Sequence, residues 1–363
     1  MLLTINQKKL MNTLRNAERL VSKGNALPIL QSLLLNAENG ALKVSATNLE
    51  IGANYYVSAK VDQEGKIAVP AKIFSDLISN INDEKVSIST KTNVMTIDSE
   101  RYHTQLLCFN PEEFPIIPVN KTKTNFRLEV SVFRKALLSV IDSVALSETR
   151  PELSGVYCNL SSQKAELAAT DSYRLSEKTF NTKESFGKAV ILPRNTVLEL
   201  IRLFDNLETD NVTAALSDNQ LFVSNEDFEL VSRLIDGKYP DYKKVIPEKF
   251  VSLARFKKSE LEKGIRTASI FSSSISDIKV KVADGEATIL AKNSDKGEIS
   301  ATLACELKNE GFELNANYNY LLDGLKAIDT DHVVLKFTGD GSPLVMTADG
   351  QDDFTYLIMP LRS

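Results

Sequence analysis

The sequence has few cysteines, and their placement suits neither a disulfide framework nor a zinc site. Cys108, Cys158 and Cys305 are odd in number and far apart along the 363 residues. Disulfide frameworks and zinc sites both need cysteines at short or paired spacings. Each cysteine stands in a strand-like apolar stretch, so we expect three reduced, mostly buried thiols, as is typical of the cytoplasm.

Long apolar segments are also missing. No stretch approaches the roughly 20 apolar residues of a membrane-spanning helix. The first residues, MLLTINQKKL, lack the basic region and long apolar core of a secretory signal. We therefore expect a cytoplasmic protein with no membrane partner.

Catalytic signatures are absent as well. The sequence contains no GxxxxGK(S/T) loop, no GxGxxG fingerprint and no HExxH pair. The only histidines, His103 and His332, lie in strand-like stretches, where a surface or hydrogen-bonded histidine is the usual reading. The acidic residues are many but scattered. We expect no catalytic residues, no metal and no cofactor, although the sequence leaves a hidden carboxylate pair open.

What the chain does contain is a threefold repeat. A strand-like segment leads three times into an amphipathic helical pattern, with starts about 125 residues apart, and each repeat carries a second helical pattern after another strand. The predicted helices are 7–22, 71–80, 131–146, 194–204, 257–270 and 317–328.

Matching residues mark the ends of the repeats. Phe114-Pro115 and Tyr239-Pro240 are 125 residues apart, and each pair precedes a polar stretch that is typical of a linker. This predicts three domains, at 1–121, 125–247 and 250–363.

Between the helices lie alternating segments with turn signals such as Asn39-Gly40 and Asp284-Gly285, which favour antiparallel hairpins. The predicted fold class is therefore α+β, with three similar domains that each pack two helices on antiparallel sheet.

Positive charge is concentrated in the predicted helices. Together they carry a net charge of +7, which leaves −12 for the rest of a chain whose total is −5. In the first helix Lys8, Asn12, Arg15 and Arg19 follow helical spacing opposite an apolar stripe. Such a face would hold phosphates without sequence preference, although a simply solvated helix face has the same pattern.

Four short strings carry a resemblance to a known family. They are Leu27-Pro28-Ile29-Leu30, the stretch ATDSYRL at 169–175, Tyr239-Pro240-Asp241-Tyr242 and Met359-Pro360-Leu361-Arg362. In this order and these repeats, they make the full chain resemble the bacterial DNA polymerase III beta subunits, the sliding clamps. Where that family commonly has Gly-His, this chain has Ser172-Tyr173, and Lys244 stands where an Arg is frequent.

The resemblance implies the DNA clamp fold and a non-enzymatic ring, a head-to-tail homodimer that encircles duplex DNA. Twelve helices packed about 9 Å apart would line a ring roughly 34 Å across between helix axes. Such a ring slides because its contacts to phosphate carry no sequence information. The implied partners are the DNA polymerase III alpha subunit, clamp-loader subunits and other proteins with a clamp-binding motif.

The resemblance also implies a pocket for partner peptides between the second and third domains. Its residues would be Leu153, Thr170, Ser172, Tyr173, Arg174, Leu175, Pro240, Val245, Tyr320, Pro343, Met359, Pro360, Leu361 and Arg362.

Two further sets complete the expectation. The residues expected to face DNA are Lys8, Arg15, Arg19, Lys23, Lys135, Arg202, Lys263 and Arg266. The apolar residues expected at the dimer interface are Leu106, Ile270 and Phe271.

Two other functions remain open. The chain could be an enzyme on the same repeat with an unrecognised acid–base pair, or a scaffold that binds proteins but not DNA. A cluster of titratable residues in a cleft would favour the enzyme, and the absence of a basic helix face would favour the scaffold.

Overall fold

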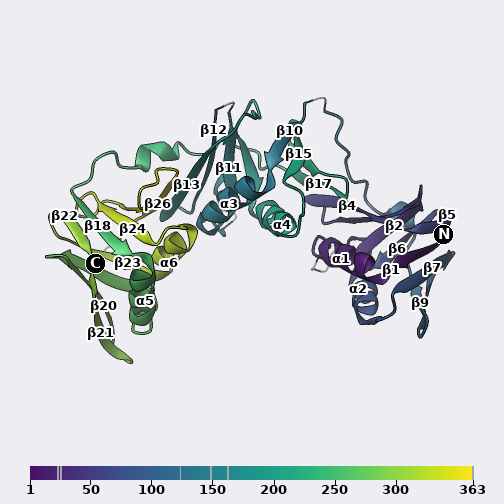
Figure 1. The fold of residues 1–363 in the computed structure, drawn as a ribbon, viewed down its shortest axis with the longest axis horizontal. Coiled ribbons are helices and arrows are strands. Elements are labelled where there is room, and N and C mark those ends of the chain that lie inside the picture. Colours follow the sequence, from purple (N-terminus) through teal and green to yellow (C-terminus); the bar gives the residue numbers. More distant parts are fainter. Residues whose placement is uncertain (23, 25–26, 123, 148, 162, 362–363) are drawn as a thin grey trace. The chain divides into compact units, whose positions relative to one another are not determined.

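The computed structural model describes the chain except residues 23, 25–26, 123, 148, 162 and 362–363. The chain divides into two compact units: Met1–Glu129 with Glu208–Leu234, and Val130–Leu207 with Ile235–Ser363. Figure 1 shows the helices and strands of the described residues. Among the described residues, no helix is long and apolar enough to cross a membrane.

In its described residues, the first unit contains two antiparallel sheets and two α-helices. One sheet has the order β5-β1-β7-β8-β9 and the other β10-β15-β16-β17-β4-β3-β2-β6. The elements are β1 (Leu2–Asn6), α1 (Gln7–Glu18), η1 (Pro28–Gln31), β2 (Ser32–Glu38), β3 (Ala41–Thr47), β4 (Ile51–Ser58), β5 (Lys60–Gln63), β6 (Gly65–Pro70), α2 (Ala71–Asn80), β7 (Lys85–Lys91), β8 (Val94–Asp98), β9 (His103–Leu107), η2 (Pro111–Glu113), β10 (Phe126–Glu129), β15 (Asn211–Leu216), β16 (Gln220–Ser224) and β17 (Phe228–Arg233).

The part of the second unit that the structure describes contains the other two sheets and four α-helices. The sheet orders are β14-β11-β12-β13-β26-β25-β24-β18-β22 and β21-β20-β19-β23. The elements are α3 (Val130–Val140), η3 (Ile141–Ser143), η4 (Pro151–Leu153), β11 (Gly155–Leu160), β12 (Lys164–Thr170), β13 (Arg174–Asn181), β14 (Val190–Pro193), α4 (Arg194–Asp205), η5 (Tyr242–Val245), β18 (Ser252–Lys257), α5 (Lys258–Ser269), β19 (Asp277–Ala283), β20 (Glu286–Asn293), β21 (Gly297–Ala304), β22 (Glu306–Asn309), β23 (Phe312–Asn317), α6 (Tyr318–Ala327), β24 (His332–Phe337), β25 (Leu344–Ala348) and β26 (Phe354–Ile358).

The predicted fold class is confirmed. The helices contact each other in the pairs α1–α2, α3–α4 and α5–α6, and they pack on antiparallel strands. The residues at the predicted hairpin turns have the required positive φ angles, 50° and 76° at Asn39 and Gly40, and 52° and 81° at Asp284 and Gly285.

Two predicted helices are shorter than their apolar patterns suggested. The helix predicted to reach Ser22 ends at Glu18, because the chain turns and the Ser22 N–H donates to the Leu30 carbonyl at 3.0 Å. The helix predicted to reach Leu146 ends at Val140 and continues as a 3-10 turn, η3. Its apolar pattern runs on into this turn, where Ile141 is buried although the residue is no longer α-helical.

The long sheets run across the repeats, which the sequence did not indicate. β17 pairs with β4 in the first unit, and β26 pairs with β13 in the second. Each of these strand pairs joins neighbouring repeats into one sheet. We call the β4–β17 pair the first junction and the β13–β26 pair the second junction. Each name includes the turn that leads into β4 or β13 and the residues that directly follow β17 or β26. The predicted peptide pocket falls on the second junction.

The three cysteines are free, as expected. Cys158 is buried in β11, while Cys108 and Cys305 are only partly buried just after β9 and β21. Burial raises the pKa of the Cys108 thiol to about 11.

Candidate peptide-binding site

The second junction brings the two predicted walls of the pocket together. Arg174 is paired with Ile358 across β13 and β26. Beyond β26, the Met359 N–H donates to the Tyr173 carbonyl at 2.8 Å, and the Leu361 N–H donates to the Asn315 carbonyl at 2.8 Å. Residues 359–361 therefore lie beside the stretch 170–175, and the hydrogen bond between Met359 and Tyr173 joins the two segments.

A tight turn presents the residues between β12 and β13. The Thr170 hydroxyl donates to the Arg174 carbonyl at 2.6 Å, and the Ser172 N–H donates to the Thr170 Oγ1 at 3.1 Å. The Asp171 carboxylate accepts from the N–H groups of Tyr173 and Arg174 at 2.9 and 3.0 Å. These bonds satisfy the turn internally, so the Ser172 and Tyr173 side chains are left exposed.

Ser172 occupies the left-handed region of backbone conformation, with φ at 79°. This conformation is strained for residues other than glycine, at a cost of roughly 1–2 kcal/mol. The turn thus needs the geometry that a glycine provides, which is the residue common in the resembling family. The substitution in this chain keeps the turn, and Ser172 carries the strain.

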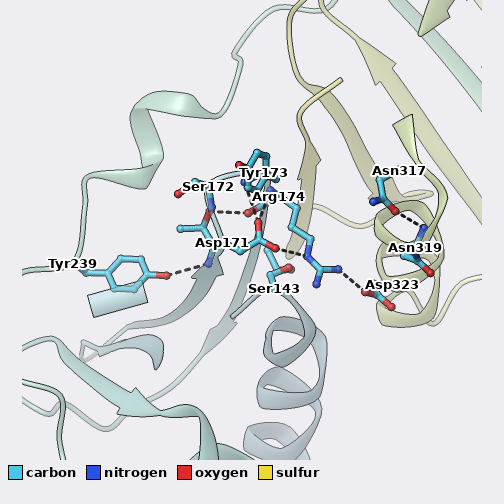
Figure 2. Close-up of polar contacts among 11 residues, drawn as sticks. Ser143, Asp171, Ser172, Tyr173, Arg174, Tyr239, Asn317, Asn319 and Asp323 are labelled. Carbon is cyan, nitrogen blue, oxygen red and sulfur yellow. Dashed lines mark hydrogen bonds and ion pairs between the residues drawn. The ribbon is translucent and has the colours of Figure 1, made fainter. Parts of the chain in front are cut away.

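Arg174 braces β13 against α6. Its Nε lies 3.0 Å from Asp171 Oδ2, its Nη1 donates to Asp323, and its guanidinium carbon lies 4.4 Å from the centre of the Tyr320 ring. Figure 2 shows the side chain reaching between the turn and the helix. Burial acts to lower the pKa of this guanidinium, but Tyr356 and the carboxylates beside it raise that pKa above its ordinary value.

The side chain of Arg174 is only 13% exposed and faces two carboxylates. It therefore fixes the geometry of the site and has little freedom to bind an anionic group of a partner. Asp171 and Asp323 complete this brace and were not among the predicted site residues. Asp323 lies one helical turn after Tyr320, a spacing that could have indicated it.

The apolar floor of the site is a buried cluster. Leu153 and Leu175 are each 2% exposed and belong to it. The cluster consists of Leu153, Ala168, Leu175, Ile191, Tyr239, Tyr242, Val345 and Leu357. Leu153 and Leu175 thus support the site from below and do not form its accessible wall.

Two tyrosines of the segment 239–245, which follows β17 and ends with η5, anchor this floor. The Tyr239 hydroxyl accepts from the Thr170 N–H at 3.1 Å, and the Tyr242 hydroxyl donates to Glu177 Oε1 at 2.8 Å. Burial raises the pKa of both phenols, and at Tyr242 the Glu177 carboxylate raises it further. Both hydroxyls therefore stay protonated over the ordinary pH range.

Only some of the predicted pocket residues contribute exposed apolar surface. Tyr173 is 63% exposed, Val245 53% and Met359 38%. Tyr320, Pro343 and Pro360 are half-buried. Pro343 directly precedes β25, whose Leu344 is paired with Ile358 next to Met359. Arg362 lies outside the described residues.

The predicted basic residues are exposed on their helices, but not all are unpaired. Arg266 is bound to Glu262 on the same helix at 2.7 Å, and Arg202 lies 3.7 Å from Glu199. In the described part of the chain, no ion pair involves Lys8, Arg15, Arg19, Lys135 or Lys263. Lys23 is among the residues not described. The net charge of the helices already includes these glutamates, but it does not indicate which arginines they pair with.

The predicted interface residues lie at or near sheet edges. Leu106 is in β9, an edge strand, and is half-buried, while its neighbour Leu107 is 80% exposed. Ile270 follows α5 and is 59% exposed. The Phe271 ring lies 3.8 Å from the place of a Cβ on Gly297, the first residue of the edge strand β21.

No cluster of three or more His, Cys, Asp or Glu residues that could hold a metal ion occurs in the described chain. The two histidines also lie apart from the junctions. His103 is exposed on β9, with Nδ1 2.5 Å from Asp98, and His332 begins β24.

Comparison with known proteins gives one family. Three family models, the N-terminal, central and C-terminal domains of the DNA polymerase III beta subunit, match residues 1–118, 127–241 and 243–362. A Staphylococcus aureus protein named beta sliding clamp is 26% identical, over 99% of each chain.

Solved structures agree with this family. The sliding clamp of Bartonella birtlesii, solved bound to griselimycin, is 26% identical and has a TM-score of 0.95 over the full length of both chains. The beta sliding clamp of C. crescentus is also 26% identical, with a TM-score of 0.94 over both full lengths. The chain belongs to the DNA polymerase III beta subunit family, the bacterial sliding clamps.

Proposed function

We propose that the protein forms a ring-shaped head-to-tail homodimer that encircles duplex DNA and tethers the replicative polymerase to it. The family match over nearly the whole chain carries this proposal. Its three domains would be bounded at 1–121, 125–247 and 250–363. No catalytic group is required, because retention on DNA would follow from closure of the ring.

The second junction would be the site that captures partners. It combines exposed apolar side chains, Tyr173, Val245 and Met359, with a rigid floor and a braced turn. Peptide grooves of this kind pair an apolar surface with a few placed polar groups. The partners would be the DNA polymerase III alpha subunit, clamp-loader subunits and other proteins that present a short apolar motif.

The unpaired basic residues would hold the DNA backbone without sequence preference. Lys8, Arg15 and Arg19 are exposed on α1 and its C-cap, and Lys135 and Lys263 are exposed on α3 and α5. Contacts of this type displace counterions, so they weaken as salt rises. Arg202 and Arg266 would contribute less, because glutamates on their own helices already partner them.

The dimer would close where two unpaired sheet edges meet. β9 is an edge of the five-stranded sheet and β21 is an edge of the four-stranded sheet. A heterologous contact of this kind closes into a ring when its rotation fits the number of copies. Leu106, Leu107, Ile270 and Phe271 would cover the apolar part of the interface.

Retention on DNA tests the function directly. Protein loaded onto nicked circular DNA should stay bound at a salt concentration that abolishes binding to short duplexes. Cutting the circle should release it within the time needed to slide off an end. Equal dissociation rates from circular and linear DNA would contradict encirclement.

A further inference from the structure

The edge strands β9 and β21 have counterparts inside the chain, and these counterparts are already paired. β4, β13 and β21 each leave a tight turn, and their first residues, Ile51, Arg174 and Gly297, are 123 residues apart. β9, β17 and β26 are each the second strand of a hairpin, with β8, β16 and β25 as the first. Pairing of β21 with β9 of a second copy would therefore repeat the first and second junctions. We call this contact between copies the third junction.

Two main-chain hydrogen bonds mark the ends of each junction within the chain, with one donor on each strand. The pairs of N–H and carbonyl are Arg233–Glu50 and Tyr56–Asp227 in the first junction, and Met359–Tyr173 and Thr179–Asp353 in the second. Corresponding positions are 123 residues apart on one strand and 126 on the other. At the third junction, the same spacing would let the Leu107 N–H donate to Lys296 and the Thr302 N–H donate to Arg101. These bonds predict one register for β21 and β9.

The apolar faces of the two strands agree with this register. Ile299 and Leu303 of β21 pack on the buried core of their repeat, on the side of α5. On the same face, the register of the other junctions would put Leu106 directly opposite Gly297. The Phe271 ring lies 3.8 Å from the place of a Cβ on Gly297. Leu106 of the second copy would therefore rest against Phe271, so that two residues expected at the interface would meet.

The opposite face of the first junction carries a polar contact between its two strands. Glu229 on β17 is directly opposite Asn54 on β4. Glu229 Oε2 accepts from Asn54 Nδ2 at 3.2 Å and from the Tyr56 hydroxyl at 2.9 Å. One acceptor on β17 thus binds the residue opposite it and the residue diagonal to it, which are the usual neighbours across antiparallel strands.

His103, Ser300 and Thr302 hold the same positions at the third junction. His103 would be opposite Ser300 and diagonal to Thr302, and the side chains of all three are exposed. Within its own copy, His103 Nδ1 lies 2.5 Å from Asp98 Oδ1. A carboxylate only accepts, so Nδ1 donates this bond and Nε2 of the neutral ring is an acceptor. The hydroxyl of a serine or threonine is a donor that fits Nε2.

We propose that His103 fixes the register of the third junction by accepting, at Nε2, a hydrogen bond from the Ser300 or Thr302 hydroxyl of a second copy. The contact rests on the proposed ring, and it supplies polar residues by which two copies recognise each other. A register shifted by one residue would carry Leu106 to the exposed face and His103 to the apolar face. The burial pattern of both strands therefore opposes the shifted pairing.

Disulfide cross-linking of the full-length protein measures the register. Gln105→Cys and Glu298→Cys in one chain would place two thiols directly opposite each other, on the exposed face of the third junction. Such opposite residues have Cα atoms about 5.5 Å apart, within the reach of a disulfide. We expect a covalent dimer on a non-reducing denaturing gel, and none from the native protein, which controls for its own cysteines. The matched pair Gln105→Cys with Ser300→Cys is diagonal, roughly 7–8 Å apart, and should cross-link several-fold less.

The dissociation constant of the dimer tests the polar contact. His103→Ala should raise this constant about tenfold, because the ring would contain the hydrogen bond twice. Thr96→Ala, on the neighbouring strand β8 and away from the edge, should leave it unchanged. Ser300→Ala with Thr302→Val removes both hydroxyls, and its effect should not add to that of His103→Ala, since the same contact is lost. Additive effects would mean that His103 acts within its own copy, and they would overturn the proposal.

Failure of this contact is distinguishable from failure of the ring. A native protein that sediments as a monomer at micromolar concentration would contradict both. A native dimer that cross-links only through the diagonal pair would overturn the register and leave the ring intact. An unchanged dissociation constant in His103→Ala would likewise overturn the contact alone. Because the replaced side chains are exposed, circular dichroism should show folded proteins throughout.

Discussion

The first and second junctions share one backbone design but present different side chains. In the first, the Thr47 hydroxyl donates to the Ile51 carbonyl at 2.9 Å, and the Leu49 N–H donates to Thr47 Oγ1 at 3.0 Å. Asn48 Oδ1 accepts from the N–H groups of Glu50 and Ile51 at 3.0 and 2.8 Å. These bonds match, position by position, those of the turn 170–174 in the second junction.

The match extends to the neighbouring strand. The Arg233 N–H donates to the Glu50 carbonyl at 2.9 Å, as the Met359 N–H donates to the Tyr173 carbonyl. The residue in the left-handed conformation is Leu49 in one turn and Ser172 in the other, with φ angles of 75° and 79°. Backbone geometry is therefore not what distinguishes the two junctions.

The two junctions differ in the side chains that surround this common backbone. The second junction has a braced arginine, an aromatic floor and exposed Tyr173 and Met359. At the position of Arg174 the first junction has Ile51, which is 3% exposed and carries no charge. The same backbone therefore carries exposed apolar side chains at the second junction, where we propose the peptide site, and a buried, uncharged residue at the matching position of the first junction.

The largest effect on stability should come from removing the Tyr242 ring. Tyr242→Ile removes a buried ring and its hydrogen bond to Glu177, so we expect a loss of about 3 kcal/mol in the free energy of unfolding. Ile117 stands 125 residues before Tyr242, at the same distance after its own aromatic–proline pair. Ile117→Val should cost less than about 1 kcal/mol because that side chain is only half-buried. Urea unfolding measures both free energies, and equal losses would contradict the different packing of Tyr242 and Ile117.

Partner binding should depend on the second junction alone. Deleting residues 359–363 removes Met359 and the main-chain bond to Tyr173. Loss of one buried anchor of about 2 kcal/mol corresponds to a roughly 30-fold drop in affinity for a clamp-binding peptide. Circular dichroism should show a folded protein, and sedimentation should show an unchanged dimer.

The matched control for this deletion is Leu234→Ala, just beyond β17 in the first junction. It should leave the peptide affinity unchanged. If the deleted protein is folded and binds the peptide with wild-type affinity, the partner site is elsewhere.

Removing Arg174 should lower the stability of the protein more than removing a more exposed arginine with the same kind of partners. Arg174→Met leaves the carboxylates of Asp171 and Asp323 without their partner, and we expect a loss of about 2 kcal/mol in stability. Arg255 on β18 also contacts two carboxylates, but Arg255 is 33% exposed and its partners 36% and 74%. Arg255→Met should therefore cost less than about 1 kcal/mol. Similar losses in both variants would mean that Arg174 is not a brace.

The sequence was sufficient to predict the elements that depend on local pattern. Helical spacing predicted each of the six α-helices found among the described residues, and Asn39-Gly40 and Asp284-Gly285 predicted their turns. Both signals are contained in short windows of sequence. The pairing of β4 with β17 joins residues about 175 positions apart, and no local pattern encodes such a contact. The sequence therefore gave no indication that sheets cross the repeats.

For the candidate site, the sequence predicted which segments lie together but not which of their side chains are exposed. The motif strings selected the two stretches that lie together, 170–175 and 359–361. Within the string 169–175 they did not separate exposed Tyr173 from buried Leu175, since burial depends on the packed cluster. Asp323 was missed because its partner, Arg174, is 149 residues away in the chain.

The smallest expected effects concern the two strained turns. Replacing Ser172 or Leu49 by glycine relieves the left-handed conformation but increases the entropy of the unfolded chain. We expect a net stabilisation of about 0.5–1 kcal/mol for each variant. The gain should be larger for Leu49→Gly, because the Leu49 side chain is 52% exposed and contributes little packing. Glu50→Gly, at the adjacent position without a positive φ, should instead destabilise the protein by a similar amount. Urea unfolding of the three variants measures the difference. If Ser172→Gly and Leu49→Gly destabilised the protein as much as Glu50→Gly does, neither turn would be strained. The positive φ angle would then not explain why a glycine suits the position of Ser172 and Leu49.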